Sequence, residues 1–283
     1  MMVYKTKRHI NTLVLLAILF SFNSCSDFLA SIGSDKEWIV NESGNIILHT
    51  RPEEFSDSNS PDEDAISIIL ENQNYYYQKI KDSLHINYNN KVLIYLYNHD
   101  EALDKIGTNS GGHAISSRLT IYYTYLPGTY IDVYDRPTYI GAKELVHLIT
   151  HRALGTNFTR MMNAGYSAAF EGSFGKAYDE ENEITVARTL NDWMQAHYIN
   201  NNILSPGQLL FETDITEEIF APNAGFFIRY LWERFGIIKI NNLFNEPSEN
   251  FKDKFMEVCN INFSTLSTEY MDYIETNFSE VNK

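Results

Sequence analysis

The chain contains only two cysteines among its 283 residues, Cys25 and Cys259. So few thiols exclude a small domain held together by several disulfides, and they exclude a zinc cluster built from cysteine ligands. A single disulfide between the two is one reading of this pair. The other is that Cys25 is modified and Cys259, in a mostly apolar stretch, is a buried small side chain.

Positive charge is also scarce. Lys and Arg number 22 against 37 Asp and Glu, which gives a formal net charge of −15. Binding to nucleic acid needs clusters of Lys and Arg that neutralise phosphates. The composition therefore predicts that nucleic acid is not a partner.

Long apolar runs are missing as well. The run from Leu13 to Phe20 is too short to span a membrane as a stable helix. Basic residues precede it, and small polar residues lead from it to Cys25, the order that is typical of a secretion signal. A cysteine directly after a small residue resembles a bacterial lipoprotein box. We predict a signal peptide over residues 1–24, a lipid on Cys25, a tether over 25–35 and one folded domain over 36–283, in the bacterial cell envelope at the outer membrane or on the periplasmic side.

The expected layout is an α+β fold, with a small N-terminal mixed sheet followed by a mostly helical C-terminal part. Residues 38–49 read as a strand pair, 65–84 as a helix and 91–97 as a central strand. Glu171 is expected to end an exposed helical turn. Further helices are expected at about 141–154, 160–178, 182–200, 206–213, 222–235, 237–245, 248–259 and 263–277.

Residues Lys143–His147 read Lys-Glu-Leu-Val-His, one residue away from the zinc-protease pattern His-Glu-x-x-His. In that pattern two histidines four apart share a helix face and hold zinc, while the glutamate polarises a bound water. The segments Arg160–Gly172 and Ala224–Gly236 follow it in the order that two further helices have in one family of zinc peptidases. Over residues 38–278 the chain resembles the gluzincins, the peptidase MA-like metallopeptidases.

The resemblance implies a zincin-like fold with a degenerate zinc site. Glu144 matches the general base and is expected to be vestigial, and His147 matches one zinc ligand. Lys143 and Ala164 stand where a histidine and a glutamate ligand would be. One protein ligand does not hold zinc, and an ammonium about 4 Å from a divalent ion costs on the order of 8 kcal/mol at an effective dielectric near 20. No metal and no other cofactor are expected.

Two finer hypotheses concern this site. Lys143 either replaces the charge of the metal close to His147 and Glu144, or extends into solvent. A zinc site shifted by one turn, to His147 and His151, is disfavoured because Leu148 would occupy the position of the general base.

In the family that the chain resembles, the substrate lies along an edge strand beside the metal helix. Here Leu119–Tyr125 is expected to be that strand, and the ligand groove is expected to include His113, Tyr122 and Tyr123. The sequence thus predicts an envelope lipoprotein that binds a polypeptide or another surface ligand without catalysis. Two alternatives stay open: an active zinc metallopeptidase with a non-standard site, for which alone zinc is expected, and a structural envelope protein.

Overall fold

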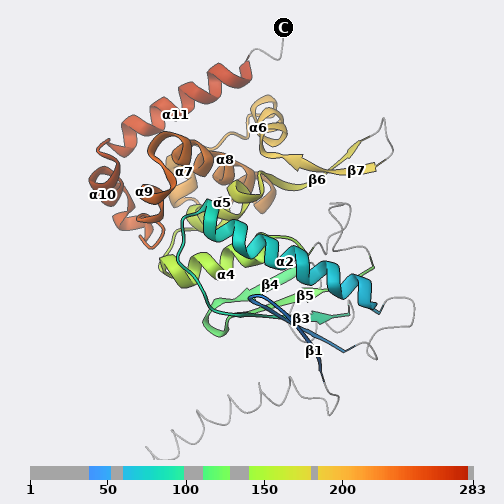
Figure 1. Cartoon of the computed structure of the whole chain (residues 1–283). Helices are drawn as coiled ribbons and strands as arrows, with labels where there is room; N and C mark the ends of the chain where they lie inside the picture. Colours follow the sequence, from blue (N-terminus) through green and yellow to red (C-terminus); the bar gives the residue numbers. More distant parts are fainter. Residues whose placement is uncertain (1–37, 52–59, 99–110, 128–139, 180–183, 280–283) are drawn as a thin grey trace, which may run out of the picture.

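The computed structural model describes residues 38–51, 60–98, 111–127, 140–179 and 184–279. The predicted signal peptide, Cys25 and the tether lie outside these ranges. The described chain has the expected α+β organisation, a small N-terminal sheet followed by a mostly helical part (Figure 1). No helix in the described ranges combines the length and the apolar character that crossing a membrane requires.

The main sheet has five strands in the order β1-β2-β3-β5-β4. Pairing is parallel between β2 and β3 and between β3 and β5, and it is antiparallel at both margins. The predicted strand pair and the central strand are confirmed. The strands are β1 (Ile39–Ser43), β2 (Ile46–Thr50), β3 (Val92–Tyr97), β4 (Gly112–Ile115) and β5 (Thr120–Thr124).

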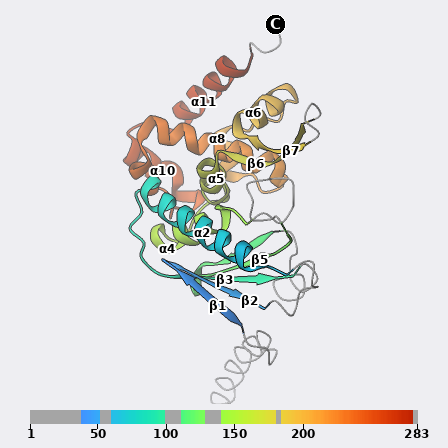
Figure 2. The same ribbon diagram turned by 45° about the vertical axis from the view of Figure 1, so that its right-hand side comes forward.

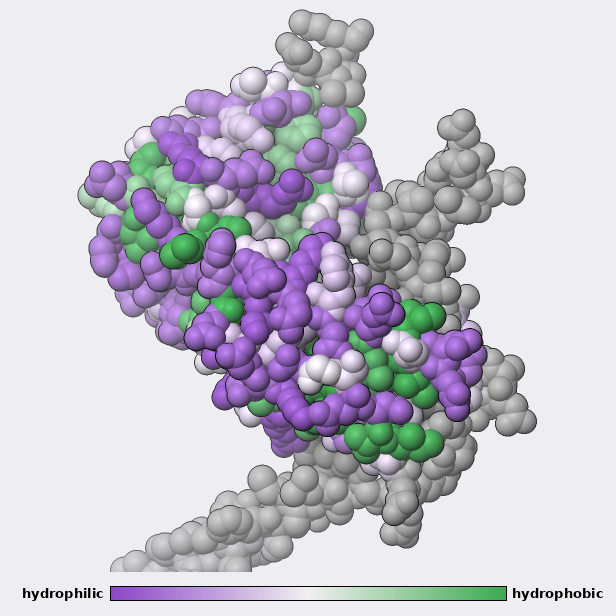
Figure 3. Space-filling view, viewed as in Figure 1, coloured by the Kyte–Doolittle hydropathy of each residue, from purple (hydrophilic) through white to green (hydrophobic). Residues whose placement is uncertain are grey.

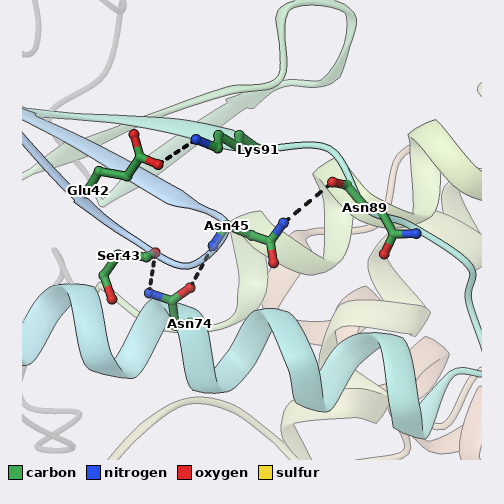
Figure 4. Close-up of polar contacts among 6 residues, drawn as sticks. All are labelled: Glu42, Ser43, Asn45, Asn74, Asn89 and Lys91. Carbon is green, nitrogen blue, oxygen red and sulfur yellow. Dashed lines mark hydrogen bonds and ion pairs between the residues drawn. The ribbon is translucent and has the colours of Figure 1, made fainter.

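The turn between β1 and β2 is fixed from the helix α2 (Glu63–Ser83), as Figure 4 shows. The Asn74 side chain accepts a hydrogen bond from the Asn45 N–H at 3.1 Å and donates one to the Ser43 carbonyl at 2.6 Å. Gly44 adopts φ +56°, and a Cβ there would lie 2.5 Å from Asn74 Oδ1. The turn therefore needs glycine both for its conformation and for the close approach of α2.

The predicted edge strand is wrong in position. β5 lies between β3 and β4, so β4 is the margin of the sheet. A short 3-10 helix, η2 (Ser116–Arg118), and Leu119 in the left-handed conformation at φ 56° join the two strands. β4 begins at Gly112, although glycine is uncommon in strands.

The sheet, the helices α2 and α4 (Lys143–Leu154), and the remaining helices follow one another as layers (Figures 1 and 2). The close α5–α8 contact depends on small residues: a Cβ at Gly165 would lie 2.9 Å from the Ala224 carbonyl, and one at Gly225 would lie 2.6 Å from Ala168 Cβ. The C-terminal helices are α5 (Arg160–Glu171), α6 (Leu190–Ile199), α7 (Pro206–Phe211), α8 (Glu217–Phe235), α9 (Ile237–Asn241), α10 (Ser248–Cys259) and α11 (Phe263–Phe278).

The predicted helices 160–178 and 182–200 are each wrong over part of their length. Gly172, with φ 72°, ends α5 in the left-handed conformation, which favours glycine. The chain then forms a two-stranded antiparallel sheet from β6 (Ser173–Asp179) and β7 (Ile184–Thr189). The Thr189 side chain and Asp192 form a capping box that starts α6.

The face shown in Figure 3 is mostly hydrophilic, with small separate apolar patches. Single exposed apolar side chains such as Phe211, Ile238 and Met256 are among those found on the described surface. Scattered exposed apolar residues are normal on a globular protein.

Candidate functional site

The site lies where the first helix after the sheet meets β4, η2 and α5. Glu144, His147 and His151 are spaced by three and four residues along α4, so they share one helix face. The prediction that Glu144 and His147 belong to one helix is confirmed. Through hydrogen bonds, this face contacts the sheet margin at Glu144 and η2 at His151.

Glu171 caps the start of α4 from the end of α5. The N-cap residue of α4 is Ala142, which has no side-chain oxygen, and the Glu171 carboxylate accepts hydrogen bonds from the backbone N–H groups of Ala142 and Lys143. Burial raises the pKa of Glu171 to about 7, opposed by the Lys143 charge and by these two hydrogen bonds. The expectation of an exposed turn at Glu171 is wrong, since its side chain is partly buried in a contact between two helices.

Glu144 is held against the margin of the sheet. Its buried carboxylate accepts the N–H of Ala114 in β4. Burial raises its pKa, while the Lys143 charge, the His113 side chain and the Ala114 N–H lower it. A Cβ at Gly112 would lie 2.7 Å from Glu144 Cγ and 2.6 Å from Tyr123 Cε1. Glycine at position 112 is therefore required for the Glu144 side chain to approach β4 this closely.

The predicted groove of His113, Tyr122 and Tyr123 is not formed. Consecutive strand residues point to opposite faces of a sheet, and both tyrosines are buried, at 5% and 1% exposure. Tyr122 packs against Tyr95 and Tyr97, whereas the Tyr123 hydroxyl donates to the Gly141 carbonyl at 3.1 Å. Of the three, only His113 is exposed.

The two histidines of α4 share Asn163 of α5 as a partner. His151 Nε2 lies 2.8 Å from Asn163 Oδ1, and His151 Nδ1 lies 2.9 Å from Ser116 Oγ. The pKa of His147 is lowered to about 3 by burial and by the charges of Lys143 and His151, against a hydrogen bond with Asn163. Burial also lowers the pKa of His151. Both imidazoles are therefore neutral at neutral pH.

Ser116 and Asn163 were missed as site residues. Asn163 directly precedes Ala164, the residue matched to the third zinc ligand, but a lone asparagine in a helix gives no signal of what it contacts. Ser116 follows β4, a strand that was not predicted from the sequence. Both could be found only once the α4–α5 and α4–η2 contacts were known.

Of the three positions matched to zinc ligands, only His147 carries a side chain of a usual zinc-ligand type. Within the described ranges, no three His, Cys, Asp or Glu side chains are grouped so that they could hold a metal ion. Ala164 is partly buried against the core. Lys143 is exposed, and in the described part of the chain its ammonium makes no hydrogen bond to Glu144 or His147. Its charge nevertheless affects the pKa of Glu144, His147 and Glu171.

The ionisable side chains therefore differ in kind along the length of α4. At its start, two carboxyl groups with raised pKa values are bound to backbone N–H groups, and one turn further on, neutral imidazoles are bound to uncharged polar side chains. No protein family model matches the chain, and no curated protein matches it significantly.

Proposed function

We propose that the protein is a cell-envelope lipoprotein with a zincin-like domain of the gluzincin kind, which has lost the zinc chemistry and binds a polypeptide along β4. The observation that carries this proposal is the free margin of the sheet beside the helix with Glu144 and His147. β4 pairs with β5, and no other described strand pairs with it.

The outer side of β4 offers backbone groups to an added strand. In an antiparallel strand the N–H and C=O of one residue point to the same side. The Ala114 N–H is bonded to Glu144 and so points away from β5, and Gly112, two residues earlier, points the same way. The N–H and C=O of Gly112 and the C=O of Ala114 are therefore positioned to pair with an extended peptide.

The same residues argue against hydrolysis at this place. A catalytic zinc needs about three protein ligands, and the matched positions supply only His147. Glu144 accepts a hydrogen bond from the strand backbone, which occupies one of the acceptor sites that a general base would use. These features favour binding over peptide cleavage.

Peptide binding can be tested with the full chain in detergent micelles and a library of extended decapeptides. We expect saturable binding that is lost when alternate peptide nitrogens carry a methyl group, because N-methylation removes the N–H groups that pair with β4. Fluorescence anisotropy measures both. Equal affinity for methylated and unmethylated peptides would rule out strand addition.

A pair of glycine variants provides the matched control. Gly112→Ala places a Cβ against Glu144 and Tyr123 and is expected to weaken peptide binding at least tenfold. Gly207→Ala meets only Ser205 Oγ, at 3.9 Å, and is expected to leave binding unchanged. Far-UV circular dichroism confirms that both variants fold.

A further inference from the structure

Ser116, His151 and Asn163 form a continuous hydrogen-bonded chain from three separate elements. Ser116 begins η2, His151 lies in α4, and Asn163 lies in α5. Ser116 Oγ is 2.9 Å from one imidazole nitrogen, Nδ1, and Asn163 Oδ1 is 2.8 Å from the other, Nε2. All three side chains are partly buried.

The asparagine determines which nitrogen of His151 carries the proton. An amide oxygen can only accept, so Nε2 is the protonated nitrogen of the neutral ring. Nδ1 then has a free lone pair and accepts the Ser116 hydroxyl. The ring is also stacked on Phe158, with a centroid distance of 4.3 Å, which fixes its orientation. A serine hydroxyl directed at an unprotonated, oriented imidazole is the arrangement that activates a nucleophile.

We propose that Ser116 is a nucleophile with His151 as its base and Asn163 as a positioning residue, acting on carboxylic esters with a good leaving group. Ser116 Oγ attacks the ester carbon and its proton passes to His151 Nδ1. The bond to the leaving alcohol then breaks, and that alcohol takes the proton from Nδ1. His151 deprotonates a water, which attacks the acyl-serine. The carboxylic acid leaves, and the proton on His151 passes to Ser116 Oγ, which restores both residues.

The neutral partner of His151 indicates which substrates this centre could cleave. In serine proteases a buried aspartate stabilises the imidazolium, and serine contacts Nε2. Here the orienting group is a neutral amide and the two nitrogens exchange roles, so the base is oriented but its charged form gains less stabilisation. Such a centre suits activated esters better than amides.

This activity goes beyond the proposed function and needs neither zinc nor Glu144. Ser116 directly follows β4, so the reactive hydroxyl lies at the end of the proposed binding margin. Peptide binding and serine reactivity are measured separately, and either can fail without the other.

The test is labelling of the full chain in detergent micelles with a fluorophosphonate, whose fluoride is displaced by a reactive serine. Mass spectrometry is expected to find the label on Ser116 and not on the adjacent Ser117, which is exposed and in the same turn. Ser116→Ala should abolish labelling and Ser117→Ala should leave it unchanged. His151→Gln should slow it about 100-fold, the scale of general-base catalysis.

The variant Asn163→Asp tests the positioning role, because a purely structural role of Asn163 would not make the rate of Ser116 labelling increase. A carboxylate in place of the amide should stabilise the imidazolium and raise the labelling rate at least tenfold. A rate at or below that of the unaltered protein would overturn the role of Asn163. Absence of label on Ser116 in the folded, unaltered protein, or equal label on Ser117, would overturn the proposal as a whole.

Discussion

At the scale of single residues, the protonation state of the Glu171 carboxyl affects the contact between α4 and α5. Its carboxylate bonds the first N–H groups of α4, where the helix dipole favours negative charge. Burial works in the opposite direction and raises its pKa from 4.5 to about 7. A raised carboxyl pKa means that the folded state binds the proton more tightly than the unfolded state does. The stability that this contributes is full below about pH 4.5 and is lost as the pH rises through about 7.

Glu171→Gln removes this titration. The free energy of unfolding of the unaltered protein minus that of the variant should fall by about 2 kcal/mol between pH 5 and pH 8. Urea denaturation at several pH values measures both free energies. Because both proteins contain the same histidines, their titration cancels in the difference. Glu71→Gln, on the exposed side of α2, is the matched control for the loss of one carboxylate. A flat difference for Glu171→Gln would show that the carboxyl is not buried as described.

Residues of the site were predictable where the signal was local. The spacing of Glu144 and His147 within a helical segment placed both on α4 without knowledge of any contact. The partner of Ser116 and of Asn163 is His151, which lies 35 residues from the serine and 12 from the asparagine in the sequence. Glu171 likewise acts on a different helix, at the start of α4. Propensity and periodicity carry no record of such partners, so their roles appear only with the packing.

At the scale of elements, predictions held where helix signals were strong and failed around glycines. The range 248–259 coincides with α10, and the other C-terminal helices from Pro206 onward differ mainly at their ends. Gly112 begins a strand that was not predicted, and Gly172 ends α5, where the predicted helix continued to residue 178. At Gly112 the cause is tertiary: the glycine is needed because Glu144 and Tyr123 lie against it.

The pairing of α4 with α5 makes a test of the zincin-like arrangement. If the two helices have the gluzincin geometry, Lys143→His with Ala164→Glu should supply the two absent ligands and bind one zinc per chain beside His147. Elemental analysis after dialysis measures the metal, and the unaltered chain should hold none.

The single variant Lys143→His is the matched control, because two histidines four apart without the glutamate should bind zinc much more weakly. A folded double variant without zinc would show that Ala164 does not face His147 as the resemblance implies.

At the scale of the whole molecule, the lipid predicted on Cys25 can be tested by where the protein is found in the cell. The sequence predicts a lipid on Cys25, and we expect membrane attachment to depend on it. Cys25→Ala should move the protein from the membrane to the soluble fraction of cells that express it, because the acyl chains supply the apolar area for binding.

Cys259→Ala is the control for this experiment. Cys259 is a free thiol, buried at 7% exposure at the end of α10, and burial raises its pKa to about 11. It should have no effect on membrane attachment. Continued membrane attachment of the Cys25→Ala protein would point to an anchor other than the lipid.

The hydrogen bonds from Glu171 to the start of α4 also join the two helices at a second point, so that α4 and α5 are connected at both ends. The chain runs along α4, turns at Gly155, returns along α5, and is joined back to its starting point through Ala142 and Lys143. The turn is itself fixed from outside, because the Asn157 N–H donates to Asn245 Oδ1 at 2.7 Å. A single backbone cut in this turn would therefore leave α4 and α5 joined at the opposite end, and the site between them would outlast the loss of its covalent connection.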